Sequence, residues 1–288
     1  MIAALLLAAA AQEATLSANN YAIDEPMPAH LGLLWSDEFD GPTLDKSKWA
    51  FDTSSNRKGW ANGELQYYAA DRPENLRLES GRLIIELRKD PELLRELPDW
   101  GKQKYSSARI VTRDKAAFKY GFIEASAKVP CARGTWPAFW MMPQGSLKWP
   151  DDGEIDILEH VGSQPNVVHA NLHTKLFNHT RGNGRGAQKS LATACSALHR
   201  YQLSWTPRAI TIGVDDRAYM RVRNDQPGGH GAWPFDAPFY IILNLAMGGD
   251  WAGAKGLDDA ALPQRFEVDY VRVYEMKPAV APEASERG

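Results

Sequence analysis

The sequence predicts an all-β protein, a sandwich of two antiparallel sheets. From residue 34 onward, short runs of alternating apolar and polar residues follow one another, separated by Gly, Pro, Asn and Asp. Such alternation is typical of strands, whose successive side chains point to opposite faces. Helical periodicity is nearly absent, and residues 91–97 are the best short helical candidate. Many strands with few helices favour two sheets packed face to face.

The segment Phe122–Val129 shows the alternation clearly. Its even-numbered residues fall on one face, whereas Ile123, Ala125, Ala127 and Val129 fall on the other. Comparable runs predict strands at 83–87, 209–214, 219–223, 239–246 and 266–274.

The chain is predicted to form one catalytic domain over residues 31–276, because all-β sandwiches of this length often fold as single units. Residues 13–30 form a polar lead-in, and the tail 277–288, rich in Ala, Pro and Glu, is expected to be disordered. We find no internal repeat and no long linker, so we expect no appended binding module.

Residues 1–12 are interpreted as a secretory signal peptide. An apolar run from Met1 to Ala11 ends in small residues, like the apolar region and cleavage site of such signals. The run contains no Lys or Arg, so its positive charge is the amino terminus alone unless the chain starts further upstream. Because it is too short to span a bilayer, we expect a secreted or periplasmic protein with no membrane span.

The composition argues against nucleic acid as a partner. The formal net charge is -3, the pI is about 6.2, and the charged residues form no basic stripe. Ten Trp residues exceed what packing usually recruits, so aromatic platforms for a ligand are expected. Cys131 and Cys195 either pair in an oxidising compartment or remain free thiols.

The segment Gly153–His160 carries three acids among aliphatic residues. In a strand, Glu154 and Asp156 share one face, opposite the two isoleucines. Glu159 has the wrong parity, which one extra residue near Leu158, a β-bulge, would correct. All three acids would then face one cleft.

A retaining glycosidase needs two carboxyl groups about 5–5.5 Å apart, one to attack the anomeric carbon and one to protonate the leaving oxygen. At the usual strand rise the Glu154 and Glu159 backbones lie roughly 13 Å apart, so only a concave sheet with long side chains brings their carboxylates together. Asp156 would lie between them, hydrogen-bond Glu154, and help keep Glu154 ionised while Glu159 holds a proton. Taken alone, the pattern also fits a solvated acidic face or a calcium site.

The acidic segment resembles the E-x-D-x-x-E motif of glycoside hydrolase family 16, in its bulge-containing, laminarinase-like form. The resemblance extends from about Leu34 to Tyr274. Further segments match the family in the expected order: 35–39, 63–68, 105–109, 134–141, 172–174, 244–249 and 268–274.

This resemblance implies a concanavalin A-like β-jelly-roll sandwich with a cleft across its concave face, which cleaves internal β-glycosidic bonds with retention. It implies that Glu154 is the nucleophile, Asp156 its assisting acid and Glu159 the general acid/base. His173 matches a family histidine near the reaction centre, although a His in such a strand is otherwise often a packed or surface residue. The chemistry requires no cofactor.

Trp136 and Trp140 lie four residues apart, and thus on one strand face if no bulge intervenes. Two neighbouring indoles form an apolar wall that suits the C–H face of a β-linked glucose. The alternative is that one of them belongs to the core. Asn62 and Arg109 match polar family positions near the glycone sugars, although Arg109 could equally be a surface cation.

Three groups fall where many family members bind a structural calcium ion: Glu38, the backbone carbonyl of Gly81 and the side chain of Asp269. Oxygen ligands suit this ion. The alternative is that both acids are ordinary surface groups. The scattered histidines and single cysteines form no transition-metal pattern.

The resemblance favours a monomeric endo-β-1,3-glucanase whose partner is a laminarin-type polysaccharide. The bulged motif disfavours unbulged lichenases and plant transglycosylases, and the segments 136–141 and 244–249 favour β-1,3-glucan over agar or carrageenan. Cleavage of mixed-linkage glucan or galactan stays an alternative, as does a non-catalytic glucan-binding protein, although such proteins typically lack catalytic acids. A legume-lectin-like binder has no support in the sequence. The loop 177–189 is expected to border the cleft.

Overall fold

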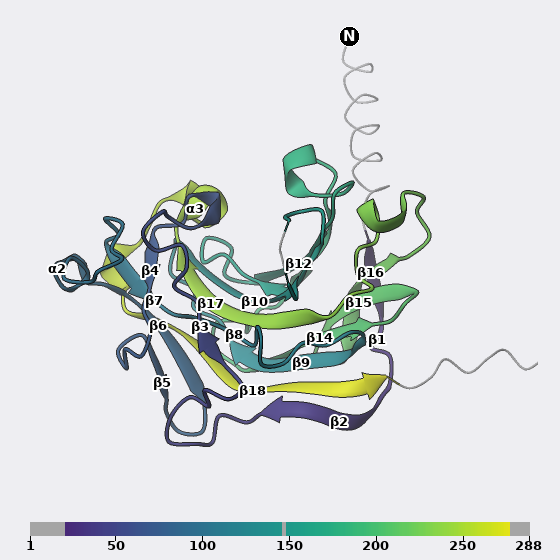
Figure 1. The fold of residues 1–288 in the computed structure, drawn as a ribbon, viewed down its shortest axis with the longest axis horizontal. Helices are drawn as coiled ribbons and strands as arrows, with labels where there is room; N and C mark the ends of the chain where they lie inside the picture. Colours follow the sequence, from purple (N-terminus) through teal and green to yellow (C-terminus); the bar gives the residue numbers. More distant parts are fainter. Residues whose placement is uncertain (1–20, 146–147, 277–288) are drawn as a thin grey trace, which may run out of the picture.

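The protein is a sandwich of two sheets. A computed structural model describes residues 21–145 and 148–276, so the predicted signal peptide and the tail lie outside the described residues. Figure 1 shows strands of both sheets curving in the same sense, with the smaller sheet on the inner side of the curve. The predicted all-β jelly-roll architecture is confirmed.

The larger, outer sheet has eleven strands among the described residues. Its main path runs β1-β16-β15-β14-β9-β18-β6-β7-β4, with β2 paired to β18 and β5 to β6. In chain order its strands are β1 (Ala22–Pro26), β2 (His30–Asp37), β4 (Gln66–Tyr68), β5 (Leu76–Leu78), β6 (Leu83–Lys89), β7 (Tyr105–Ser107), β9 (Gly121–Lys128), β14 (His199–Trp205), β15 (Ala209–Val214), β16 (Arg217–Arg223) and β18 (Gln264–Met276).

The inner sheet has seven strands among the described residues, in the order β13-β12-β11-β10-β17-β8-β3. Their bounds are β3 (Ala50–Phe51), β8 (Arg109–Val111), β10 (Thr135–Pro143), β11 (Glu154–Glu159), β12 (Val167–His173), β13 (Arg185–Ser190) and β17 (Phe239–Met247). The helical elements of the described chain are short: α2 (Pro91–Leu94), α3 (Gly249–Ala252), η1 (Ala61–Gly63), η2 (His179–Arg181), η3 (Gly229–Gly231), η4 (Gly253–Lys255) and η5 (Asp259–Ala261).

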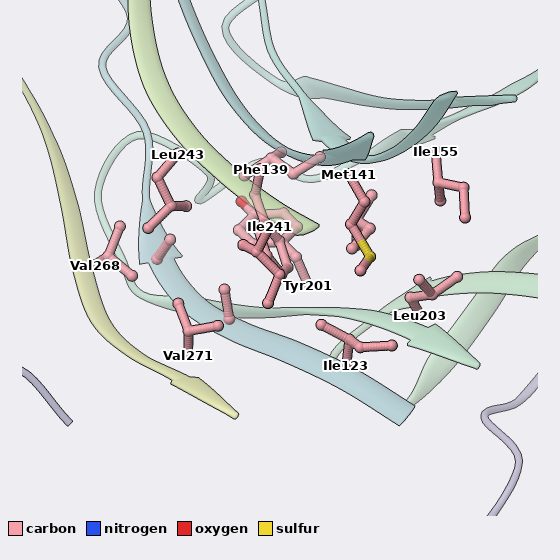
Figure 2. Packing of buried hydrophobic residues seen from close by; sticks show 14 of the residues in the cluster. Ile123, Phe139, Met141, Ile155, Tyr201, Leu203, Ile241, Leu243, Val268 and Val271 are labelled. Atoms are coloured by element: carbon pink, nitrogen blue, oxygen red, sulfur yellow. The ribbon is translucent and has the colours of Figure 1, made fainter. Parts of the chain in front are cut away.

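The core lies between the sheets. Alternate residues of β9, including Ile123, face Phe139 and Met141 of β10 across the gap, and all three are fully buried. Figure 2 shows Ile155 of β11 pointing into the same layer. The inner sheet is therefore held by an apolar layer on one face, which leaves its other face free to carry polar groups. Part of the tryptophan excess also belongs to the core, because Trp205 is completely buried.

The structure differs from the sequence prediction in a few elements. The lead-in 13–30 contains β1, an edge strand that is mostly exposed and therefore needs no apolar alternation. The predicted helix at 91–97 ends at Leu94, the only buried residue of α2, and residues 95–97 form a turn and a bend before Pro98, because the residue before a proline disfavours the helical conformation. Residues 185–189 of the predicted loop 177–189 belong to strand β13. One strand pair, β4 with β7, is parallel.

Cys131 and Cys195 form a disulfide, which decides between the two states that the sequence left open. Cys131 follows β9 and Cys195 precedes β14, so the bond joins two loops that lie 64 residues apart in sequence. A crosslink of this span restricts the unfolded chain considerably.

Removing the disulfide should lower stability without changing the fold. We expect the double variant Cys131→Ser, Cys195→Ser to have an unfolding free energy about 2–4 kcal/mol lower than that of the oxidised, unmodified protein. Denaturant titration of both proteins measures the difference. The unmodified protein treated with a thiol reductant is the matched control and should lose a similar amount. Equal stability of the variant and the oxidised protein would contradict the prediction.

Candidate active site

A β-bulge in β11 sets the direction of its acids. Against β10, Phe139 pairs with Leu158 and the next residue, Trp140, pairs with Asp156, so Ile157 is extra. The pairing with β12 shows the same irregularity between Asp156 and Glu159. The predicted bulge is confirmed. It places Glu159 on the same face as the two preceding acids because it shifts the alternation by one residue.

The face of the inner sheet that points away from the core carries a cleft with a cavity of about 520 Å³. Its floor comes from β8, β10, β11 and β17, and its walls from the loops around residues 52–64, 149 and 179. The predicted residues that line it are Asn62, Arg109, Trp136, Trp140, Glu154, Asp156 and Glu159. The sheet thus brings into one cavity residues that span almost a hundred positions of sequence.

Each of the two outer acids has its own hydrogen-bond donors. Asn171 Nδ2 donates to Glu159 Oε2 at 2.6 Å, and Trp136 Nε1 donates to Glu159 Oε1 at 3.2 Å. Trp149 Nε1 donates to Glu154 Oε2 at 3.1 Å. These donors fix the two carboxyl groups at opposite ends of the acid row.

His173 lies beside the middle of this row. It pairs with Glu154 across β11 and β12, and its Nε2 is 3.3 Å from Asp156 Oδ2 and 3.7 Å from Glu154 Oε1. The sequence led us to expect a hydrogen bond between Asp156 and Glu154, whereas the contact of Asp156 in the structure is to His173. The neighbouring strand β12 supplies this contact.

Burial is the largest cause that raises the pKa of all three acids. Together with the charge of Asp156, burial raises the pKa of Glu154 to about 8. The pKa of Asp156 rises well above its ordinary value through burial and the charge of Glu159. Burial also raises the pKa of Glu159, while His173, Asn171 and Trp136 oppose the rise. These directions oppose the expectation that Glu154 is ionised while Glu159 holds a proton, because that expectation considered neighbouring charges and not burial; the expectation stays a prediction.

The two predicted indoles face the cleft. Both Trp136 and Trp140 are half-buried, and β10 pairs with β17 without interruption, so the two side chains share one face. Trp136 contacts Trp251 edge to face at 5.3 Å, and Trp140 Nε1 donates to Asn244 Oδ1 at 2.7 Å. Both indoles therefore line the cavity, and Trp140 also packs against the apolar cluster of Val111, Met142, Tyr240 and Ile242.

Asn62 and Arg109 lie on the side of the cleft formed by β8 and the chain after β3. Asn62 occupies a left-handed position in η1, with φ of 58°, at the cavity wall. Arg109 is not an ordinary surface cation, because its Nε lies 3.0 Å from the buried carboxylate of Asp52.

Sequence reasoning missed several residues of the cleft wall. Trp60, Glu64, Trp149 and His179 all line the cavity. Trp149 could have been found from its position five residues before Glu154, and Glu64 lies inside a segment that already resembled the family. His179 carries no local signal, since its place next to His173, with ring centroids 5.1 Å apart, depends on how the loop folds back.

The predicted calcium ligands lie on the outer sheet and have other partners. Both carboxylate oxygens of Glu38 accept hydrogen bonds from Arg272, at 3.0 and 2.7 Å. Asp269 faces Arg82 and Ser126, at 3.9 and 3.5 Å, and Gly81 occupies a turn with φ of 72°. In this arrangement Glu38 is paired with Arg272, so a calcium ion would have to compete with this ion pair.

A β-sandwich whose concave face carries a row of carboxyl groups flanked by indoles is the architecture of a carbohydrate-cleaving enzyme. Residues 63–272 match the Glycosyl hydrolases family 16, and the chain belongs to this family.

Its relatives include a beta-glucanase of Rhodothermus marinus, 48% identical over 254 residues that cover 85% of each chain. Among solved structures, a variant of SCLam, a non-specific endo-β-1,3(4)-glucanase, is 48% identical with a TM-score of 0.85, covering 89% of this chain and all of that one. A laminarinase from Rhodothermus marinus is 45% identical with a TM-score of 0.79, covering 87% and 99%.

The raised pKa of Glu154 predicts how the folding stability depends on pH. A buried acid whose folded pKa is above its ordinary value of 4.5 binds more protons when folded, so stability falls as the pH rises from about 4.5 to about 8. Glu154→Gln removes this term. We expect its melting temperature to exceed that of the unmodified protein by roughly 2 °C or more at pH 8, and by less at pH 5.

Glu96 is exposed on the turn after α2, so Glu96→Gln serves as the matched control. Its melting temperature should follow that of the unmodified protein across the same pH range. A Glu154→Gln variant whose advantage does not grow between pH 5 and pH 8 would mean that the carboxyl group is not penalised by burial.

Proposed function

We propose that the protein is a retaining endo-β-1,3-glucanase that acts on laminarin-type β-glucan. The observation that carries the proposal is the placement of Glu154, Asp156 and Glu159 on one face of a bulged strand, inside an indole-lined cleft. Membership of family 16 and relatives described as laminarinases support it.

In this proposal the reaction proceeds by double displacement. Glu154 attacks the anomeric carbon while Glu159 protonates the leaving glycosidic oxygen, which gives a glycosyl ester on Glu154. Glu159 then takes a proton from water, the water oxygen bonds to the anomeric carbon, and the ester bond breaks. Two inversions restore the original configuration.

Asp156 and His173 would regulate the charge of the nucleophile. Asp156 raises the pKa of Glu154, whereas His173, 3.7 Å from it, lowers that pKa. Glu154 must lose its proton before it attacks. His173 favours the ionised form of Glu154 and Asp156 disfavours it, so the two together set the pH at which Glu154 can act as the nucleophile.

A second proposal concerns which β-glucans the cleft accepts. SCLam, at 48% identity, is described as non-specific, and the structure of its variant presents a 1,3-β-D-cellobiosyl-glucose at the active site. We propose that this chain likewise accepts mixed-linkage β-1,3-1,4-glucan as a secondary substrate, because the indole faces that line its cleft would contact sugars without distinguishing linkages sharply.

The two glutamates can be tested separately. We expect Glu154→Gln to lower kcat at least about 10³-fold on laminarin while oligosaccharide binding persists, since the cleft walls are unchanged. Glu159→Gln should lose less activity on an activated aryl glycoside than on laminarin, because a good leaving group needs no proton. Product sizing and NMR of the first-formed anomer measure chain cleavage and retention.

The same assay on laminarin, mixed-linkage glucan, agarose and carrageenan gives the specificity. Short oligosaccharides mainly from laminarin, with β-configuration, would support the proposal. Predominant release from a galactan, inversion of the anomer, or persistent turnover by Glu154→Gln would overturn it, and absence of turnover on all four would favour a glucan-binding protein.

Calcium, cellular location and assembly stay predictions. A calcium ion at Glu38 would first have to displace Arg272, and a higher melting temperature in calcium than in chelator would reveal such an ion.

Export is supported by the Cys131–Cys195 disulfide, because such bonds persist in oxidising compartments. Fractionation of the producing cells tests it. Among the described residues no helix has the length and apolarity to cross a membrane. Light scattering tests the predicted monomer.

A further inference from the structure

The disulfide between Cys131 and Cys195 lies against a buried histidine. His160 Nε2 is 3.7 Å from Cys131 Sγ, and the ring nitrogen and both sulfur atoms lie within 4.8 Å of one another. The three residues are far apart in sequence, and they come from the loop after β9, the residue after β11 and the loop before β14. We propose that, once the disulfide is reduced, Cys131, Cys195 and His160 bind a zinc ion. This inference is independent of the proposed function.

Two thiolates and one imidazole form a ligand set that suits zinc. In a tetrahedral site with Zn–S of about 2.3 Å and Zn–N of about 2.0 Å, neighbouring ligand atoms lie roughly 3.5–3.8 Å apart. The distance between His160 Nε2 and Cys131 Sγ already falls in this range. The Cα atoms of the two cysteines are 5.8 Å apart, so rotation of their side chains can bring the separated sulfur atoms to a similar distance.

The surroundings of the three residues also suit an ion. The carbonyl oxygen of Pro165 lies 3.0 Å from Cys195 Sγ and 3.5 Å from Cys131 Sγ, so an oxygen is available beside the three ligand atoms. Both cysteines are only half-buried, which leaves a path for a reductant and for the ion. Burial lowers the pKa of His160 to about 4, so at neutral pH the ring is uncharged, as a metal ligand must be.

The backbone holds the three residues together without the disulfide. Val129 N donates to Ala194 O at 3.3 Å, which joins the chain before Cys131 to the residue before Cys195. Gly162 approaches the loop of Cys131 so closely that a Cβ atom on it would lie 1.8 Å from Ala132 O. The thiols therefore stay beside His160 after reduction, and an ion that enters a formed site need not order the chain.

Reduction and zinc binding are separate steps. A dithiol reductant transfers two electrons and two protons to the disulfide, which gives two cysteine thiols while the reductant closes its own disulfide. Zinc then replaces both thiol protons, so two protons are released for each ion bound and the affinity increases with pH. Because the thiolate is the metal ligand, oxidation back to the disulfide expels the ion. The two cysteines therefore hold either a disulfide or a zinc ion, according to the redox conditions.

Cobalt(II) serves as the probe, because it occupies tetrahedral zinc sites and absorbs visible light there. The full chain is reduced with dithiothreitol, freed of reductant under anaerobic conditions and titrated with Co²⁺. We expect thiolate-to-cobalt absorption in the near ultraviolet and tetrahedral bands in the visible, which saturate at one ion per chain and disappear when Zn²⁺ is added. The oxidised protein and the Cys131→Ser, Cys195→Ser variant should show neither signal. The acids of the cleft cannot produce the thiolate band.

The variant His160→Gln tests the third ligand. We expect it to bind Co²⁺ at least about tenfold more weakly than the unmodified, reduced protein. His230 is exposed and lies outside the site, so His230→Gln is the matched control and should keep the full affinity. Melting temperatures show whether each variant is folded. If His160→Gln does not fold, X-ray absorption of the zinc-loaded, unmodified protein identifies the ligands directly, with sulfur at about 2.3 Å and nitrogen at about 2.0 Å.

Three results would overturn the inference. These are the absence of a thiolate band in folded, reduced protein, an equal Co²⁺ affinity of folded His160→Gln, and a zinc coordination shell without sulfur. The glucanase proposal is tested separately, by cleavage of laminarin with the oxidised protein, so the failure of one proposal leaves the other standing.

Discussion

The bulge in β11 is the constraint on which the site depends. Strand side chains alternate strictly, so a regular strand would turn Glu159 toward the apolar layer between the sheets. The extra residue at Ile157 avoids this, while Ile157 and Leu158 both remain completely buried. The same few residues therefore satisfy the core on one face and complete the acid row on the other.

Burying three carboxyl groups in one row opposes folding, and the surrounding strands limit that cost. Donors from β10, β12 and the loop before β11 reach the two outer acids, and His173 lies against the middle one. The pKa values of all three acids remain raised, because these contacts offset only part of the cost of burying the ionised carboxylates. A stability cost of this kind is commonly tolerated at active sites, where the chemistry requires groups that change protonation.

The cleft walls use aromatic groups in two ways. Trp136 contacts an acid directly through its N–H, whereas Trp140 and Trp60 use theirs to anchor themselves to asparagines. A cleft built in this manner presents apolar ring surfaces between fixed polar groups, which is how proteins usually recognise a sugar polymer. The core beneath the sheet makes this possible, because a rigid floor holds the distances between walls.

The sequence by itself determined the all-β class, several of the longer strands of the sandwich, the family, and the shared face of Glu154, Asp156 and Glu159. These features are local: alternation and parity can be counted along the chain, and a parity error of one residue predicts a bulge. Only the tertiary structure decided the contact of His173 with Asp156, the Cys131–Cys195 bond, the strand formed by the lead-in, the depth of burial that raises the acid pKa values, and the approach of His160 to the two sulfur atoms. Each of these depends on which distant segments are neighbours in space, and a single sequence carries no local pattern for that.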